Sequence, residues 1–134
     1  MSQVSTFVMF QGEAQRAIDL YSQVFERFRL MQVQHYDPTP DGRRLIKHAS
    51  IDFDRQNLVF TDSPISHDFS FTPAVSLFIN LPNEEALERA FHRLAEGGKV
   101  LMPLDDYGFS ARFGWLNDRF GLSWPLNVPA GDLP

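Results

Sequence analysis

The sequence predicts an α+β protein built from two successive βαβββ modules. Both halves of the chain show the same order of one strand, one helix and three strands. Each expected helix carries an apolar stripe at helical spacing. A short segment of the first helix, residues 15–18 (Gln-Arg-Ala-Ile), is echoed in the second helix by residues 88–91 (Glu-Arg-Ala-Phe). Because the order of elements also matches, we interpret this echo as a sign of internal duplication.

Composition bounds the class of protein. The 134 residues suit one domain, 1–134, with modules at about 4–62 and 74–127. The net charge of −5 argues against a nucleic-acid partner, and the lack of cysteine excludes thiolate chemistry. The chain has no apolar run of about 20 residues and begins without a signal-peptide pattern, so we expect no membrane partner and a cytoplasmic location.

The first module is expected to hold one helix among four strands. Gly12 opens a helix at 13–25, whose apolar positions follow the helical period from Ala14 to Phe25. A Pro- and Gly-containing loop and a turn separate the strands that follow. The strands are predicted at 6–10, 28–36, 45–53 and 58–61.

The second module follows a polar connector at 62–73. Asn83 is a favourable N-cap for a helix that the Gly97-Gly98 pair ends. A loop is expected at 103–108 and a turn at 118–121. The strands are predicted at 74–80, 99–101, 110–117 and 122–127.

Three motifs together resemble a known family. They are Gly12-Glu13-Ala14-x-x-Ala17-Ile18-x-x-Tyr21-x-x-Val24-Phe25, then Leu94-x-x-Gly97-Gly98-Lys99-Val100-x-x-Pro103-Leu104, and finally Phe113-Gly114-Trp115-Leu116-x-Asp118-Arg119-Phe120-Gly121-x-x-Trp124. They are similar to the PhnB-like branch of the vicinal-oxygen-chelate (glyoxalase/bleomycin-resistance) superfamily, also labelled demethylubiquinone methyltransferase-like. The sequence offers no glycine-rich loop after a strand that would suit S-adenosylmethionine.

The resemblance implies a curved mixed sheet with a concave pocket, and a homodimer. Metal-dependent relatives place His, Glu or Gln at four inward strand positions, which correspond here to about Thr6, Val59, Ala74 and Pro125. None of these is a strong ligand, and a divalent metal needs three or four donor groups. We therefore expect no metal and no other cofactor.

His48 is the leading candidate for polar chemistry. Strand alternation places His48, Ser50 and Asp52 on one face, opposite the row that packs under the helix. A neutral imidazole there could act as a base beside Asp52, or it could be a half-buried histidine satisfied by a neighbour. Asp62, at the end of a strand, is expected either to cap a turn or to contact a ligand.

Strand alternation also predicts a set of pocket residues. Phe10, Phe78, Ser123 and Asn127 are expected to face the cavity, whereas Trp124 is expected to face the helix. By the same alternation, Trp115 falls on the same strand face as Phe109 and Phe113. These three could line either the pocket or a dimer interface.

The function predicted from these observations is a metal-free small-molecule-binding protein. Its ligand would be moderately apolar, because the expected pocket has rings and few charges. The alternative is a lyase or isomerase that uses His48 with a pocket carboxylate, Asp52 or Asp62. A glyoxalase I-like metalloenzyme ranks below both.

Overall fold

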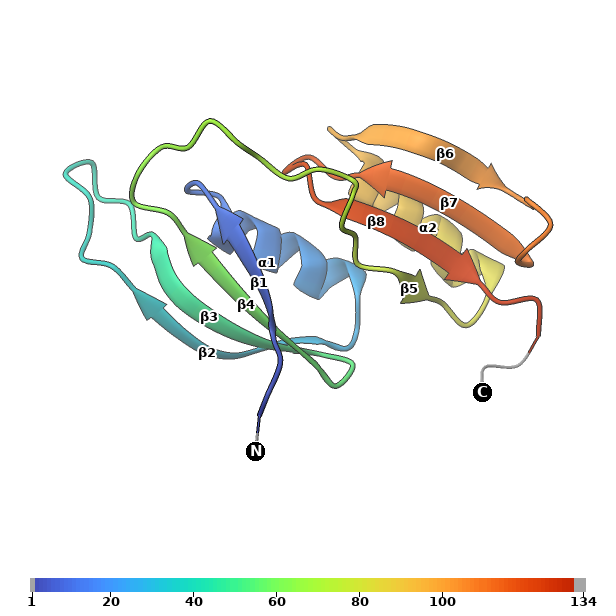
Figure 1. Ribbon diagram of the computed structural model, residues 1–134, viewed down its shortest axis with the longest axis horizontal. Coiled ribbons are helices and arrows are strands. Elements are labelled where there is room, and N and C mark those ends of the chain that lie inside the picture. The colour runs from blue at the N-terminus through green and yellow to red at the C-terminus, as the bar shows by residue number, and fades with distance from the viewer. Residues whose placement is uncertain (1, 132–134) are drawn as a thin grey trace. The chain divides into compact units, whose positions relative to one another are not determined.

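A computed structural model describes residues 2–131. The chain forms two compact units, and the boundary between them in the sequence lies between Asp68 and Phe69. Unit 1 precedes this point and unit 2 follows it. Each unit holds one βαβββ module, and its helix lies across its own four-stranded sheet (Figure 1). The α+β class is therefore confirmed. The expected modules, 4–62 and 74–127, each fall inside one unit.

The sheet of unit 1 is mixed, in the order β1-β4-β3-β2. Strand β1 pairs in parallel with β4, and the other two pairings are antiparallel. The parallel pair needs a crossover, which the helix provides. The elements are β1 (Thr6–Phe10), α1 (Ala14–Val24), β2 (Phe28–His35), β3 (Ile46–Phe53) and β4 (Gln56–Asp62).

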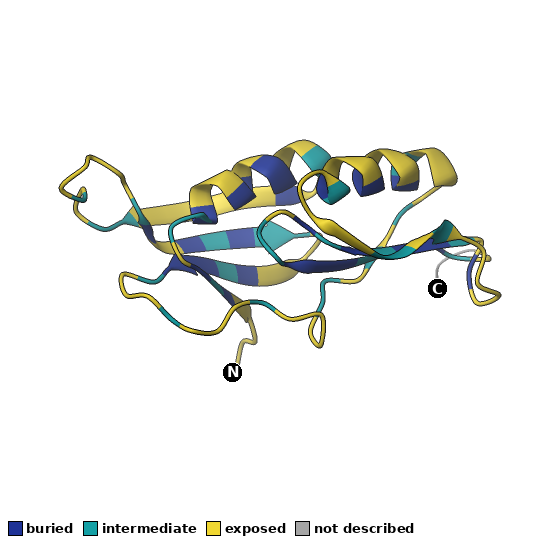
Figure 2. Ribbon diagram, turned by 90° about the horizontal axis from the view of Figure 1, so that it is seen from above, coloured by how far each residue is buried: buried dark blue, intermediate teal, exposed yellow. Residues whose placement is uncertain are grey.

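Aromatic rings form the core of unit 1 between α1 and the sheet. The buried side of the helix faces the sheet (Figure 2) and carries Tyr21, which is fully buried. Its ring meets the edges of Phe28 and Phe60 at centroid distances of 5.6 and 6.1 Å. Edge-to-face packing of this kind adds about 1 kcal/mol beyond the burial of area.

Phe10 belongs to this core, which corrects its predicted orientation toward a cavity. It is 3% exposed, and its ring lies 5.1 Å from that of Phe60. Along β1 the residues that point the other way are Phe7 and Met9, because Val8 and Phe10 are the buried pair. The sequence did not show which face of β1 carries Phe10, because residues 6–10 are nearly all apolar and do not alternate between polar and apolar.

Unit 2 repeats the architecture with the sheet order β5-β8-β7-β6. Asn83 caps α2 as expected, since its Oδ1 accepts a hydrogen bond from the Ala86 N–H at 2.8 Å. Glu84 and Glu85 occupy the first turn, where negative charge is favourable. The elements are β5 (Ile79–Asn80), α2 (Glu84–Ala95), β6 (Lys99–Asp105), β7 (Arg112–Asn117) and β8 (Ser123–Val128).

Two predicted boundaries in unit 2 need correction. Strand β5 holds only Ile79 and Asn80, although the Leu77 N–H still bonds to the Ser123 carbonyl at 3.1 Å. Strand β6 continues to Asp105, through residues predicted as a loop because of Pro103. Its pairing with β7 shifts register twice, and such irregularities accommodate a residue without an N–H.

Trp124 is fully buried in unit 2, which confirms that its row faces the helix. Its indole N–H donates to Asp118 Oδ2 at 2.9 Å. The other oxygen of Asp118 accepts from the N–H groups of Phe120 and Leu122 at 2.9 and 3.0 Å. One 3% exposed carboxylate thus closes the turn before β8 and satisfies the buried indole.

The hairpin between β3 and β4 turns through two residues, Asp54 and Arg55, with φ values of 49° and 71°. Such turns prefer Asp-Gly, because the left-handed region costs an L residue about 1 kcal/mol. We expect Arg55→Gly to raise the free energy of unfolding by about 0.5 kcal/mol, since greater freedom of the unfolded chain offsets part of the gain. Urea unfolding measures this change. Arg44→Gly, outside the left-handed region, should not stabilise, and an unchanged or lower midpoint for Arg55→Gly would contradict the prediction.

Candidate functional site

Each sheet has one face under its helix and one face pointing away from it, here called the opposite face (Figure 2). Ala49 and Ile51 of β3 are buried on the helix side, so His48, Ser50 and Asp52 lie on the opposite face. In β7, Gly114 and Leu116 lie on the helix side, so Phe113 and Trp115 lie on the opposite face. Most of the predicted site residues are therefore on the two opposite faces.

His48 is exposed and interacts with Ser50. Its Nε2 lies 3.2 Å from Ser50 Oγ. Asp52, two residues further along, instead forms an ion pair with Arg29 and accepts the backbone N–H of Arg55 at 2.9 Å. His48 therefore interacts with the Ser50 hydroxyl. The Asp52 carboxylate, which was expected beside His48, instead binds the Arg29 guanidinium and a backbone N–H.

Asp62 is a structural carboxylate. It is 1% exposed, and its Oδ1 accepts the N–H groups of Gly12 and Ala14 at 2.9 and 3.0 Å. Its Oδ2 accepts the Ile46 N–H at 2.9 Å. These bonds join the end of β4 to the start of α1 and the start of β3. The capping role that the sequence allowed is therefore the one the contacts support.

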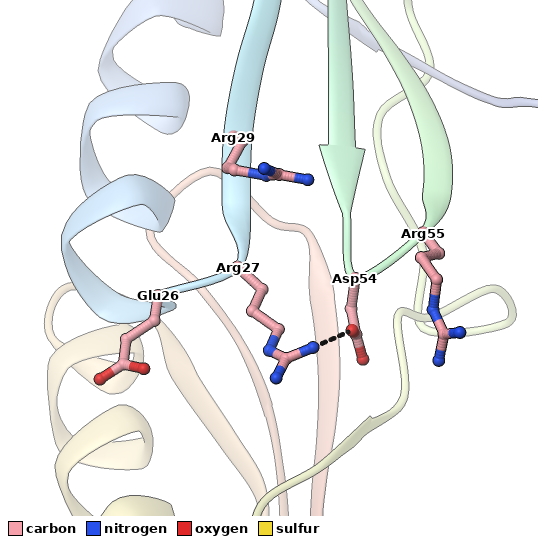
Figure 3. A pocket seen from close by; sticks show the side chains of 5 residues that line it. All are labelled: Glu26, Arg27, Arg29, Asp54 and Arg55. Atoms are coloured by element: carbon pink, nitrogen blue, oxygen red, sulfur yellow. Dashed lines mark hydrogen bonds and ion pairs between the residues drawn. The ribbon is translucent and has the colours of Figure 1, made fainter.

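A pocket of about 390 Å³ lies in unit 1 where the start of β2 meets the β3–β4 turn, and His48 is not among its lining residues (Figure 3). Arg27 in this pocket pairs with Asp54 at 3.1 Å, but both side chains are more than half exposed, so the ion pair contributes little. The sequence did not indicate this pocket, because it forms only where the start of β2 meets the β3–β4 turn. Its lining residues are Glu26, Arg27, Arg29, Asp54 and Arg55.

Ser123 and Trp115 form a hydrogen-bonded group in unit 2. The Trp115 indole N–H donates to Ser123 Oγ at 2.8 Å, and the Ser76 hydroxyl lies 2.6 Å from the same oxygen. Ser123 is fully buried, and Trp115 is half-buried. Trp115 and Ser123 are thus in contact on the opposite face of unit 2, and the Ser123 hydroxyl makes its hydrogen bonds within that unit.

Three aromatic side chains gather around Phe113 on the opposite face of unit 2; this ring cluster consists of Phe78, Tyr107, Phe109 and Phe113. Phe113 is 6% exposed, whereas Phe78 and Phe109 are 55% and 60% exposed. The rings of Phe109 and Tyr107 meet Phe113 edge-on at 5.0 and 6.1 Å, and Phe78 lies 6.4 Å from it. Sequence parity indicated Phe78, but nothing in the pattern pointed to Tyr107.

Asn127 adjoins the ring cluster. It pairs in register with Phe113 on one side and with Asn80 on the other. Its Nδ2 donates to Asn80 Oδ1 at 2.8 Å, and its own Oδ1 is buried without a hydrogen-bond partner in residues 2–131. An unmet buried acceptor of this kind costs about 1–3 kcal/mol.

The metal-ligand positions implied by the resemblance do not fit a metal. Val59 and Pro125 lie on the opposite faces and have no donor atom in their side chains, and Ala74 also has none. Thr6 offers only a hydroxyl. Within the described part of the chain, no three His, Cys, Asp or Glu side chains gather as a ligand set.

Neither described helix, in residues 2–131, is long and apolar enough to cross a membrane.

Comparisons with known proteins place the chain in a family. The family described as 3-demethylubiquinone-9 3-methyltransferase matches residues 2–127. A solved PhnB protein from Bacillus cereus, described as a putative 3-demethylubiquinone-9 3-methyltransferase, is 38% identical. It covers 95% of this chain and 99% of its own, with a TM-score of 0.87. Protein PA1353 from Pseudomonas aeruginosa is 28% identical, covering 96% of this chain and 98% of its own, with a TM-score of 0.82.

More distant relatives extend the comparison. Protein YjdN of Escherichia coli is 23% identical over 93% of this chain and 94% of its own length. The fosfomycin resistance protein FosX of Listeria monocytogenes shares the fold, with 9% identity, coverage of 99% and 95%, and a TM-score of 0.64. The resemblance inferred from the three sequence motifs is confirmed. The chain belongs to the family described as 3-demethylubiquinone-9 3-methyltransferase, which includes the PhnB protein, and it shares the fold of FosX.

Proposed function

We propose that this protein is a metal-free small-molecule-binding protein and that its ligand is moderately apolar. The observation that carries the proposal is the opposite face of unit 2, where exposed Phe78 and Phe109 surround a buried ring beside hydrogen-bonding groups. Exposed apolar patches rimmed by polar residues are typical of ligand-binding surfaces. The family resemblance described under the sequence analysis also implies a concave pocket for such a molecule.

The metal-free part of the proposal rests on the donor set. The positions that would hold a metal carry methyl, methylene and hydroxyl groups, which are poor ligands for a divalent transition metal. The test is elemental analysis of protein purified without chelator or affinity tag. We expect no stoichiometric metal, and no gain of activity on adding Ni²⁺, Zn²⁺, Mn²⁺ or Fe²⁺. One bound metal ion per chain would overturn the metal-free assignment.

The binding part is tested by thermal unfolding against a library of small aromatic and aliphatic molecules. A ligand at 100 times its Kd adds about 2.7 kcal/mol of stability, which raises the Tm of a chain this size by roughly 10 °C. We expect such shifts for moderately apolar compounds and none for sugars or nucleotides. If no compound of any class shifts the Tm, the binding function is wrong.

An enzyme remains the second candidate, because His48 presents an exposed imidazole beside the Ser50 hydroxyl. A neutral imidazole can act as a general base or as a hydrogen-bond donor. Turnover of a ligand from the screen that is lost in His48→Ala, but kept in His92→Ala, would favour a lyase or isomerase. Equal behaviour of the wild type and both variants would exclude His48 from any reaction.

We also propose that the protein acts as a homodimer. The family resemblance described under the sequence analysis implies a homodimer, and unit 1 exposes apolar side chains that an interface could cover, including Phe7, Met31 and Val33. Size-exclusion chromatography with light scattering should give twice the chain mass of 15.4 kDa. A mass of one chain at micromolar concentration would contradict the proposal.

A further inference from the structure

We propose that the pocket of unit 1, where the start of β2 meets the β3–β4 turn, binds a small aromatic carboxylate, and that Arg55 recognises its carboxylate group. The pocket is separate from the ring cluster of unit 2. The inference therefore goes beyond the binding function proposed above and can fail independently of it. It is carried by the size and charge of the pocket, the unpaired guanidinium group of Arg55, and the backbone conformation at that residue.

The pocket has the size of a small-molecule site, and guanidinium groups outnumber carboxylates in its lining. Its volume of about 390 Å³ falls within the range of about 300–1,000 Å³ that is usual for ligand pockets. Arg27, Arg29 and Arg55 line it together with two carboxylates, in a chain whose net charge is −5. Guanidinium groups bind carboxylates through parallel N–H donors and also stack on aromatic rings. An aromatic carboxylate uses both properties.

One positive charge in the pocket is left without a partner. Arg27 is paired with Asp54 at 3.1 Å, and Arg29 is paired with Asp52. Arg55 donates its backbone N–H to Asp52, but its guanidinium group has no hydrogen bond or ion pair within residues 2–131. A ligand with a single negative charge matches this one group. A doubly charged phosphate ester would exceed it and would be repelled by the carboxylates of the lining.

The backbone at Arg55 indicates that its side chain does not serve the fold. Its φ of 71° lies in the left-handed region, where a two-residue hairpin turn ordinarily has glycine. The bond to Asp52 uses the backbone N–H, which glycine would supply equally well. The arginine therefore makes the turn less stable by about 1 kcal/mol than glycine would. Residues in such strained conformations cluster at ligand sites.

The rest of the pocket suits a flat apolar group. Figure 3 shows the side chains of Arg27, Asp54 and Arg55 extending from the same end of the sheet. The Arg27 and Arg29 side chains are 75% and 64% exposed, and each guanidinium group is held by an aspartate. An aromatic ring can therefore lie against their planar groups while those ion pairs stay intact.

The test compares three naphthalene probes by fluorescence anisotropy. 2-Naphthoate carries one negative charge, 2-naphthamide carries none, and 2-naphthyl phosphate carries about two at neutral pH. We expect 2-naphthoate to bind about tenfold more tightly than 2-naphthamide, and more tightly than the phosphate ester. Equal binding of 2-naphthoate and 2-naphthamide would overturn recognition by a guanidinium group. Tighter binding of the phosphate ester would overturn the ligand class, and failure of 2-naphthoate to saturate by about 10 mM would overturn the site.

Two arginine variants locate the recognising group. Arg55→Gly removes the guanidinium group and keeps the fold, because glycine suits the turn. We expect it to weaken 2-naphthoate binding about tenfold and to leave 2-naphthamide binding unchanged. Arg44→Gly removes the same charge outside the pocket lining and should change neither. Unchanged 2-naphthoate binding in Arg55→Gly, or an equal loss in Arg44→Gly, would overturn the role of Arg55.

Asp54→Asn is the complementary variant, expected to improve binding. It removes a negative charge from the lining and frees Arg27 from its ion pair, while asparagine tolerates the φ of 49° at this position. We expect 2-naphthoate to bind about threefold more tightly, and binding that is unchanged or weaker would contradict the assigned charge.

Phe109→Ala, in the ring cluster of unit 2, separates this inference from the proposed function. We expect 2-naphthoate binding to be unchanged in this variant. Binding that is lost in Phe109→Ala but kept in Arg55→Gly would assign the probe to the ring cluster. That result would overturn the carboxylate site and leave the proposed binding function standing.

Discussion

Replacing Asp62 with alanine is expected to lower the free energy of unfolding by about 3–5 kcal/mol. The carboxylate is 1% exposed and accepts three backbone N–H groups, from Gly12, Ala14 and Ile46. Each buried donor that loses its acceptor costs about 1–3 kcal/mol, and water entering the vacated space recovers part of this. The loss approaches the whole stability of a typical domain. Equilibrium unfolding in urea measures it.

Two further variants separate the hydrogen bonds from the charge. Asp62→Asn keeps one accepting oxygen, so it should lose roughly half as much stability as Asp62→Ala. Asp68→Ala removes an exposed carboxylate and should change stability by less than about 0.5 kcal/mol. An Asp62→Ala protein as stable as Asp68→Ala would show that the three N–H groups find other partners.

Gly98→Ala is expected to destabilise the protein by more than about 3 kcal/mol, or to prevent folding. A Cβ at this position would lie 2.1 Å from the Asn117 carbonyl oxygen and 2.9 Å from the Asp118 carbonyl carbon. Both atoms are backbone, so no side-chain rotation relieves the overlap. Lys99, the next residue, pairs with Asn117. Moving the two strands apart to make room for the Cβ would therefore break the hydrogen bonds between β6 and β7.

Gly97 provides a matched control in the same turn. It has φ of +73°, and a Cβ there would meet only the Arg119 Cβ at 3.3 Å. Gly97→Ala should therefore cost about 1–2 kcal/mol, the ordinary penalty of an alanine in the left-handed region. Thermal unfolding of the two variants side by side tests the ranking. Equal losses would mean that the turn adjusts freely and that the close approach at Gly98 is not a constraint.

The architecture was predictable because its signals are local. The apolar stripe around Tyr21 and Leu87 fixes the helices, and the Asn83 cap marks where the second helix begins. Trp124 could be assigned to the core because it shares a strand face with Leu122 and Leu126, whereas Ser123 and Asn127 lie on the other face. Phe10 could not, because Thr6–Phe10 is nearly all apolar and the face is decided by packing against Phe60.

The candidate site was harder to predict because its residues are brought together by the pairing of strands that are distant in the sequence. Asn127 was expected to face the cavity. That its Nδ2 bonds to Asn80 while its Oδ1 has no hydrogen-bond partner in residues 2–131 depends on how β5 pairs with β8. Tyr107 joins the ring cluster from a segment with no periodicity, so no pattern could place it against Phe113. The Arg29–Asp52 ion pair likewise depends on the pairing of β2 with β3.

Every strand pairing within residues 2–131 is made inside one half of the chain. The longest-range strand pairing in the first half joins Thr6–Phe10 to Leu58–Asp62, and Asp62 then joins the end of β4 to the start of α1 and the start of β3. During synthesis, therefore, the first ladder has all its partners once residue 62 has left the ribosome. The first half can form its hydrogen bonds before the second half exists, which shortens the time that its edges are open to wrong partners.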